Sequence, residues 1–232
     1  MNLKNKLLKV AGKDNFSIDD NISSVYVLRL CWKYGWMMVR GALFSTISRN
    51  ISSKCFIGKK VKLYEKRKIV IGEKTKIHDR VKIDALSSEG VQIGTGCVIG
   101  ENTKIECTGS LSAVGKGISI GDRTTFGSDC YFGAAGGISI GNDVVAGQYV
   151  RFHSENHSYE DLGILIKDQG VTHKGIKIGN NCWIGAGAVF LDGAELEDGC
   201  VVAANAVVTK AFVENSVIGG VPAKVIKKRG EQ

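Results

Sequence analysis

The sequence has very little proline, with Pro222 alone among 232 residues, although it has 30 glycines. Collagen and disordered linkers are usually rich in both, so the imbalance excludes them and indicates that the glycines serve backbone geometry. No apolar run reaches the roughly 18 residues of a membrane-spanning helix, and the N-terminus lacks the apolar core of a signal peptide. The seven cysteines form no CxxC pair and show no metal-ligand spacing. These absences predict a cytoplasmic protein with free thiols and no bound metal.

The net charge of +8 is spread along the chain in small basic clusters rather than in one basic run. No base-reading motif is present, and no basic stretch is interleaved with aromatic residues. We therefore expect no nucleic-acid partner. Attraction to an anionic small molecule or to an acidic membrane surface explains the same charge.

An aliphatic residue, often followed by glycine, recurs every six positions over most of the chain. This period fits neither an amphipathic helix nor an array of hairpins. It fits short parallel strands and turns that wind around a prism, with one apolar residue per unit pointing inward. Four cysteines occupy the small-residue place of their units, which predicts interior positions. One run of the period is Ile178, Ile184, Phe190, Leu196, Val202 and Val208.

The period stops for about 25 residues around the sequence RFHSENHSYEDLG, residues 151–163, which contains two of the four histidines. We expect a loop excursion over residues 153–175. A connection of that length is longer than ordinary turns and is often functional.

Residues 1–50 lack the period and form a separate helical segment, which we set apart from a domain of residues 51–232. Residues 25–44 are apolar and aromatic, and on a helix Arg29, Lys33 and Arg40 share one face. Ser23 or Ser24 would cap the start of this helix. Two interpretations stay open and are compatible. The helix packs on the open end of the prism, or residues 24–44 lie on an acidic membrane.

The repeats, together with IKIGNNCWIGAGAVF and NAVVTKAFVENSVIGGVPAKVIKK, resemble the hexapeptide-repeat acyltransferases over roughly residues 57–228. The resemblance is most specific from residue 140 onward, and it is to sugar and polysaccharide O-acetyltransferases. It implies an all-β fold, a left-handed parallel β-helix, with an N-terminal helical segment and a short C-terminal helix. Left-handed winding is an exception to the usual right-handed crossover. It also implies a homotrimer with active sites shared between subunits.

His157 is the candidate catalytic base. Acetyl transfer to a hydroxyl needs a group to accept the hydroxyl proton, and histidine titrates near neutral pH. In the related enzymes a histidine occupies the loop before the Trp-Ile-Gly coil, and His157 follows Gly141 by 16 residues and Asn156 directly. His153 is the next candidate. A Ser-His-acid hydrolase is disfavoured, because no G-x-S-x-G surrounds the loop serines.

The resemblance also implies that acetyl-CoA is the co-substrate. Its contacts would come from the tryptophan step and its glycine, from two alanines whose backbone meets the pantetheine arm, and from polar or basic residues near the nucleotide. These residues are Trp183, Gly185, Ala186, Ala204, Thr209, Lys210 and Lys227.

The chain departs from the family pattern at two places. Asn205 stands where the family usually has glycine, and asparagine also tolerates a left-handed turn. Gly127 occupies the place of a substrate-contacting asparagine, so we expect other acceptor contacts, from Asp129, Tyr131 and Asn156.

We therefore expect an acetyl-CoA-dependent O-acetyltransferase that acts on a sugar or surface glycan, in the cytoplasm or at the inner face of its membrane. N-acetylation of an amino sugar uses the same machinery and stays open. A zinc enzyme of the gamma carbonic anhydrase type is disfavoured, because this chain lacks the upstream histidine that such a zinc site needs. A non-enzymatic β-helix would not need the residues assigned to coenzyme A.

Overall fold

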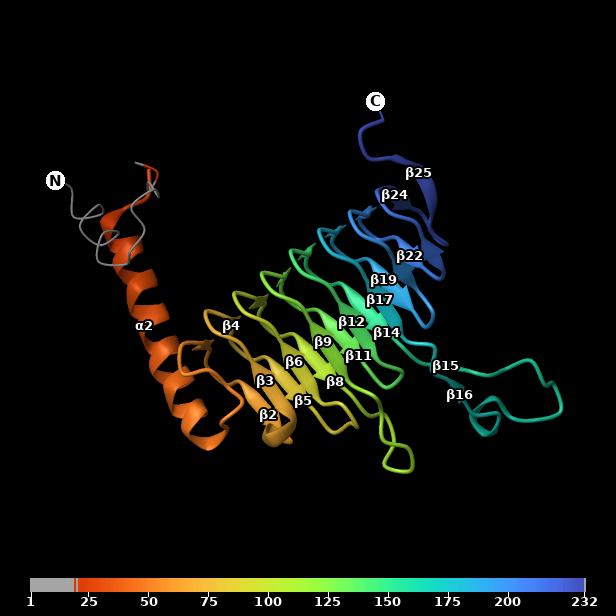
Figure 1. Ribbon diagram of the computed structural model, residues 1–232, viewed down its shortest axis with the longest axis horizontal. Helices are drawn as coiled ribbons and strands as arrows, with labels where there is room; N and C mark the ends of the chain where they lie inside the picture. Colours follow the sequence, from red (N-terminus) through yellow and green to blue (C-terminus); the bar gives the residue numbers. More distant parts are fainter. Residues whose placement is uncertain (1–18, 20, 232) are drawn as a thin grey trace.

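The chain forms a three-sided prism of stacked coils with one long helix at its first end, and Figure 1 shows the successive coils along the prism. The computed structural model describes residue 19 and residues 21–231, so the rest of the predicted segment 1–50, residues 1–18 and 20, lies outside the described residues. Parallel strands in three sheets form the three faces of a left-handed β-helix. The predicted fold class is confirmed in this respect.

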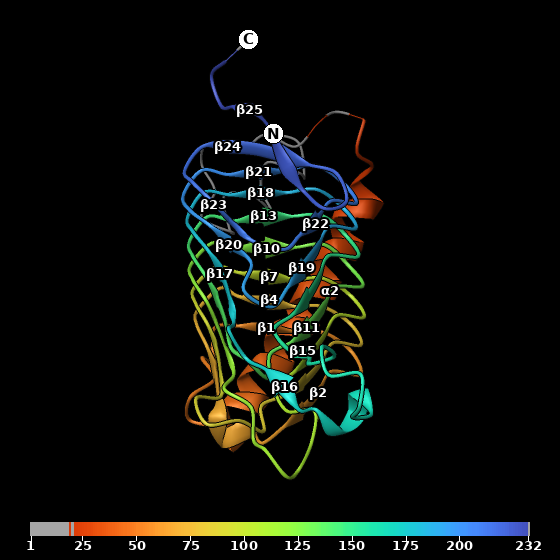
Figure 2. The ribbon, with the colours of Figure 1, turned by 90° about the vertical axis from the view of Figure 1, so that its right-hand side faces the viewer.

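Each face collects one strand from each complete coil, and the first face also contains β24 and the returning strand β25. The first face consists of β1 (Phe56–Ile57), β4 (Lys76–Ile77), β7 (Val98–Ile99), β10 (Thr125–Phe126), β13 (Val145–Ala146), β18 (Trp183–Ile184), β21 (Val201–Val202), β24 (Ser216–Gly219) and β25 (Lys224–Lys228). The second face consists of β2 (Lys62–Tyr64), β5 (Lys82–Asp84), β8 (Lys104–Glu106), β11 (Tyr131–Gly133), β14 (Arg151–His153), β19 (Val189–Leu191) and β22 (Val207–Val208). The third face consists of β3 (Ile69–Ile71), β6 (Val91–Ile93), β9 (Ile118–Ile120), β12 (Ile138–Ile140), β17 (Ile176–Ile178), β20 (Glu195–Leu196) and β23 (Ala211–Phe212). The first-face strands follow one another in chain order up the stack (Figure 2).

The six-residue period sets the register between coils. On the second face Phe132 pairs with Phe152, and Phe152 pairs with Phe190. All three phenyl rings are fully buried, and the ring centroids lie 4.9 Å and 4.8 Å apart. Because like residues stack on like residues in successive coils, the core is a continuous apolar column inside the prism.

The turns at the prism corners confirm two smaller predictions. Asn205 has a φ of 58°, the left-handed conformation expected of a residue that replaces glycine. The four cysteines at small-residue places are buried, as are two others, while Cys31 is exposed. The cysteines predicted to be interior are Cys97, Cys130, Cys182 and Cys200.

The helix α2 (Ser24–Ile47) packs against the first coil and leaves much of its surface exposed. Ser23 caps it, since its side chain accepts a hydrogen bond from the backbone N–H of Tyr26 at 3.2 Å. Gly41 allows the close approach, because a Cβ there would collide with the carbonyl of Cys55. The predicted packing on the end of the prism is therefore observed.

The predicted short C-terminal helix is wrong. Residues Lys224–Lys228 form the strand β25, which runs antiparallel to β24 and pairs Gly219 with Lys224. The last coil of a prism leaves a row of backbone groups without a further coil to pair with, and a returning strand satisfies them.

One corner of the prism carries two excursions. We call the connections from a second-face strand to the next third-face strand the second–third corner; an ordinary one spans residues 134–137. Residues 107–117 form a longer loop there, and residues 154–175 form the predicted excursion, which projects from the prism (Figure 1). It contains β15 (Asn156–His157), β16 (Val171–Thr172) and the short 3-10 helix η2 (Ile166–Asp168); a second 3-10 helix, η1 (Lys66–Lys68), lies in the first coil.

Candidate active site

Buried polar side chains hold both ends of the excursion. The hydroxyl of Ser154, which is fully buried, donates to the carbonyl of Gly133 at 2.9 Å and accepts from the N–H of Gly136 at 3.0 Å. At the other end the carboxylate of Asp192 accepts hydrogen bonds from the N–H groups of Lys174 and Gly175, at 3.0 and 2.8 Å. The role of Ser154 is thus structural, and the excursion has fixed ends.

His157 lies at the end of the two-stranded antiparallel ladder inside the excursion. The backbone of His157 pairs with Val171, and that of Asn156 pairs with Thr172. The side chains of His157 and Asn156 are exposed, and among the described residues neither one makes a hydrogen bond. The backbone of His157 is therefore held by the ladder, and its imidazole faces solvent.

A second histidine closes the base of the same ladder. His173, which follows β16, has its Nε2 atom 2.6 Å from the Oε2 atom of Glu155, which precedes β15. Both side chains are about one-third exposed. This contact joins the two strands below His157, and no local sequence pattern indicates it because the two residues are 18 positions apart.

A small cavity of about 160 Å³ lies beside the base of the excursion, on the second face. The rings of Tyr131 and His153 lie there with their centroids 5.4 Å apart and their planes tilted by 37°. The hydroxyl of Tyr131 donates to Glu106 at 3.3 Å, and Lys82 forms a 2.8 Å ion pair with the same carboxylate. The cavity joins polar groups from β8, β11, β14 and both excursions of this corner.

Burial and neighbouring charges tune the groups in this cavity. The hydrogen bond from Lys82 holds the pKa of Glu106 below its usual value, so the carboxylate stays ionised. Burial is the main cause that raises the pKa of Tyr131, and the negative charge of Glu106 adds to it. The hydroxyl therefore stays protonated and can donate a hydrogen bond. Burial, with a contribution from Arg151, lowers the pKa of His153 and favours its neutral form.

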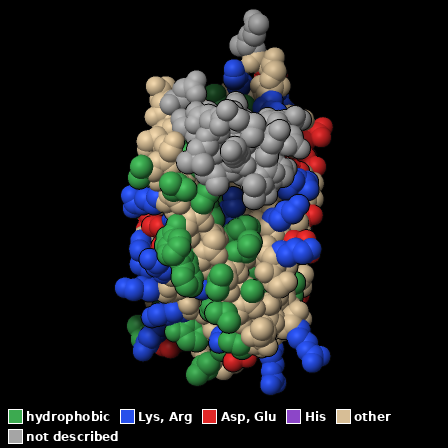
Figure 3. Space-filling view, turned by 90° about the vertical axis from the view of Figure 1, so that its left-hand side faces the viewer, with side chains coloured by type: hydrophobic (Ala, Val, Ile, Leu, Met, Phe, Trp, Pro, Cys, Tyr) green, Lys and Arg blue, Asp and Glu red, His purple; other side chains and the backbone are tan. Residues whose placement is uncertain are grey.

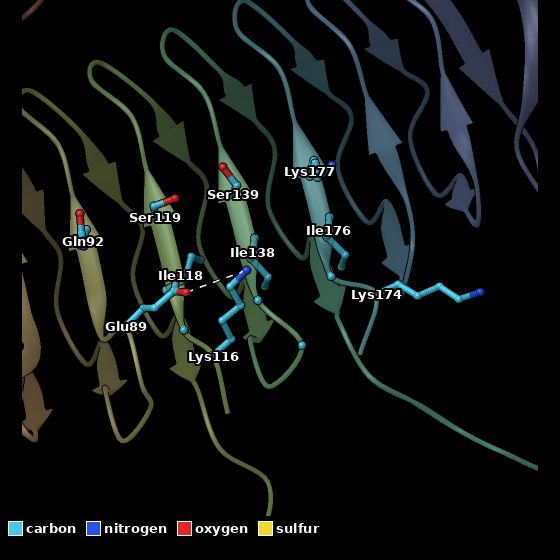
Figure 4. A pocket seen from close by; sticks show the side chains of 14 residues that line it. Glu89, Gln92, Lys116, Ile118, Ser119, Ile138, Ser139, Lys174, Ile176 and Lys177 are labelled. Atoms are coloured by element: carbon cyan, nitrogen blue, oxygen red, sulfur yellow. Dashed lines mark ion pairs between the residues drawn. The ribbon is translucent and has the colours of Figure 1, made fainter. Parts of the chain in front are cut away.

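A shallow groove of about 280 Å³ lies on the other side of the same corner, on the third face (Figure 4). Ser119 and Ser139 stand in register on adjacent strands, and Lys177 follows them on β17. Lys116 bridges to Glu89 with 3.9 Å between Nζ and Oε1, the pair drawn as a dashed line. The six-residue register aligns these side chains, but the depth of the groove depends on the corner loops that flank it.

The candidate acceptor contacts do not all meet. Tyr131 lines the second-face cavity, whereas Asn156 lies in the ladder. Asp129 sits in a turn at the corner between the first and second faces, with a φ of 61°, and it accepts a 2.9 Å hydrogen bond from Asn102. Asp129 is thus part of a turn at a different corner from His157.

The residues assigned to coenzyme A are divided between two corners in one chain. Gly185, Ala186 and Ala204 lie at the corner between the first and second faces, where Gly185 faces the backbone of Ala204 so closely that a Cβ would lie 2.5 Å from its nitrogen. Thr209 and Lys210 lie at the second–third corner, between β22 and β23.

Trp183 is 59% exposed on the first face, beside a groove of about 450 Å³ that Arg229 also lines. Lys227 lies in β25 on the same face, and its Nζ donates to the carbonyl of Glu231 at 2.9 Å. The assigned residues thus lie on the first face and at two corners of the prism.

Comparison with known proteins identifies the repeats. Residues 175–210 match the family model described as bacterial transferase hexapeptide (six repeats), and residues 117–148 match the hexapeptide repeat of succinyl-transferase. Both ranges fall within the prism and lie on either side of the excursion.

Curated relatives include a probable acetyltransferase of Mycobacterium tuberculosis, 30% identical over 69% of this chain and 50% of that protein. A putative lipopolysaccharide biosynthesis O-acetyl transferase of Escherichia coli is 30% identical over 51% of this chain and 64% of its own length. The chain thus spans about half to two thirds of the length of these relatives.

Solved structures with the same fold include the N-acyltransferase AntD from Bacillus cereus in complex with dTDP and 3-hydroxybutyryl-CoA. It is 19% identical with a TM-score of 0.51, over 78% of this chain and 81% of that one. At this identity the likeness concerns the fold. The two matched segments show that the prism contains hexapeptide repeats, and the sequence relatives show that the chain is similar to bacterial acetyltransferases.

Proposed function

We propose that the protein is an acetyl-CoA-dependent O-acetyltransferase that acts on a sugar or surface glycan. The observation that carries the proposal is the exposed His157, which lies on a two-stranded ladder in the excursion of residues 154–175. The relative from Escherichia coli, named for lipopolysaccharide biosynthesis, supports a glycan acceptor.

In the proposed reaction both substrates bind together and the acetyl group passes directly between them. The imidazole of His157 accepts the proton of the acceptor hydroxyl as its oxygen attacks the thioester carbonyl. A backbone N–H stabilises the negative charge on the carbonyl oxygen. The carbon–sulfur bond then breaks, and the imidazolium returns its proton to the departing thiolate, so the products are the acetyl ester and free coenzyme A.

Coenzyme A is the proposed co-substrate, and a homotrimer supplies its complete site. The division of the assigned residues between two corners supports this arrangement. In a trimer, the first face of one prism, or the corner between its first and second faces, would lie next to the second–third corner of its neighbour. The tip of the excursion carries exposed apolar side chains, with Leu162 99% exposed and Tyr159 65% exposed. A neighbouring subunit would cover such groups. Sedimentation of the full chain tests the trimer.

The proposal includes a location and a division of the chain. We propose that the enzyme works in the cytoplasm at the inner face of the membrane, with residues 1–50 as a segment distinct from the β-helix domain of residues 51–232. Limited proteolysis of the full protein tests the division, since cleavage within residues 1–50 that leaves the prism intact is expected.

An acceptor screen tests the reaction. The protein is incubated with acetyl-CoA and a panel of sugars and glycans, free thiol release is followed, and the product is identified by its mass. Acetyl ester formation supports the proposal. Acetylation at nitrogen of an amino sugar would assign the same machinery to an amine acceptor, and thiol release with no acceptor present would count against a ternary complex.

A further inference from the structure

The helix α2 uses only a narrow side to contact the prism. Met37 and Gly41 are buried at that contact, while an apolar stripe on another side of the helix is exposed. Trp32 is 71% exposed and Trp36 is 45% exposed, with their ring centroids 5.9 Å apart. Figure 3 shows hydrophobic side chains gathered on this end of the molecule with lysine and arginine side chains around them. The exposed stripe consists of Val25, Leu28, Trp32, Trp36, Val39 and Leu43.

A groove of about 550 Å³ separates the cationic side of α2 from the prism. Arg29, Lys33 and Arg40 line it from the helix, Lys59 lines it from the first coil, and both tryptophans form part of its wall. The guanidinium of Arg40 is anchored, since its Nε donates to the carbonyl of Ile57 at 2.7 Å. Four cations and two indoles therefore surround one cavity.

The acidic side chains in this groove already have partners. The carboxylate of Asp79 accepts a hydrogen bond from the N–H of Lys59 at 2.7 Å, and Glu101 forms a 3.0 Å ion pair with Arg80. Among residue 19 and residues 21–231, the four cations of the groove form no ion pair. The groove thus has an excess of positive charge that a bound anion would neutralise.

Charge also selects the occupant of the apolar stripe. The helix α2 contains no aspartate or glutamate, so two copies packed through this side would bring cations together with no opposing charge. No described helix is long and apolar enough to cross a bilayer. An exposed apolar stripe with tryptophans, bordered on one side by the three cations of the helix, suits a helix that lies in the interface of an anionic membrane.

We propose that α2 and the adjoining groove form a docking site for an anionic phospholipid surface. The phosphate of a lipid headgroup binds between Arg29, Lys33 and Lys59, while Trp32 and Trp36 lie at the boundary between headgroups and acyl chains. The site gives the membrane location of the proposed function a structural basis. It does not depend on the acyl transfer chemistry.

The test is flotation of the full-length protein with vesicles of phosphatidylcholine, alone or mixed with phosphatidylglycerol. The wild type is expected to float with the mixed vesicles, and added salt is expected to weaken the association. The variant Arg29→Gln with Lys33→Gln is expected to bind about thirtyfold more weakly, because each cation near such a surface contributes about a fivefold gain. Trp32→Gln with Trp36→Gln is expected to lose association at any salt concentration.

The matched control, Lys104→Gln with Lys224→Gln, removes the same charge from exposed positions on other elements and is expected to float like the wild type. Equal losses for the control and the groove variant would overturn the site, because net charge would then explain the binding. A wild type that does not float with mixed vesicles would also overturn it. So would a groove variant whose sedimenting mass differs from that of the wild type while its flotation stays the same. Acetyl transfer to a soluble acceptor without vesicles is measured separately, so failure of that reaction leaves the docking result standing.

Discussion

The Nε2 atom of His173 lies 2.6 Å from the Oε2 atom of Glu155, and the contact joins the two strands that carry His157 at their exposed end. Because both side chains are about one-third exposed, we expect the variant Glu155→Gln to change the free energy of unfolding by less than about 1 kcal/mol. We expect faster hydrogen exchange at the backbone amides of β15 and β16. Glu160→Gln, at an exposed position of the same loop, is the control; equal exchange in both variants would show that the contact does not hold the ladder.

His157→Ala tests the proposed base. Loss of one positioned base is expected to lower turnover by about 10²- to 10⁴-fold. Thermal unfolding, sedimentation and coenzyme A affinity are expected to stay unchanged, because the exposed imidazole makes no hydrogen bond among the described residues. A variant with nearly full activity on its true acceptor would remove His157 from the mechanism, and His153→Ala would then be examined.

Lys210→Ala combined with Lys227→Ala tests the assignment of the nucleotide end of coenzyme A. If these ammonium groups meet the 3′-phosphate, the double variant is expected to lose more affinity for coenzyme A than for its 3′-dephospho form. Isothermal titration with both ligands measures the difference. Equal losses for the two ligands would contradict the phosphate assignment.

Two partly buried histidines predict a loss of stability in mild acid. Burial is the first cause that lowers the pKa of His78 and of His153 below 6.5; Lys33 and Arg151 add to it respectively. The unfolded chain therefore takes up protons at a higher pH than the folded chain. The stability that the two neutral histidines contribute is complete above pH 6.5. It is lost as the pH falls through their lowered pKa values. Urea midpoints at about pH 7.5 and about pH 5.5 measure it. His78→Gln with His153→Gln is expected to flatten the dependence, and an unchanged slope would refute this origin.

The aromatic column on the second face predicts a large core effect. Phe152 is fully buried between Phe132 and Phe190, so Phe152→Ala is expected to lower the free energy of unfolding by about 3–5 kcal/mol. Phe152→Leu, which leaves less empty volume, is expected to cost less. Denaturant titration measures both variants. Similar small losses would mean that neighbouring coils close the gap.

The sequence by itself determined the prism, because a six-residue period places one apolar residue of each coil directly over the next and the register follows from that repetition. It also located the helix, predicted over residues 24–44 and observed at Ser24–Ile47, and the excursion that carries His157, and it limited the cap to Ser23 or Ser24. Each of these features depends on local pattern or on contact between successive coils, which a linear sequence displays.

Tertiary structure alone decided the contacts between residues that the period does not align. The pair of Glu155 with His173 and the cavity that joins Glu106 with Tyr131 depend on where two irregular loops leave one corner. The hairpin of β24 and β25 replaced the expected helix because the open end of the last coil offered it backbone partners. The groove beneath α2 arises in the same way, since the position of a helix across the first coil is set by packing at Gly41 and not by its own sequence pattern.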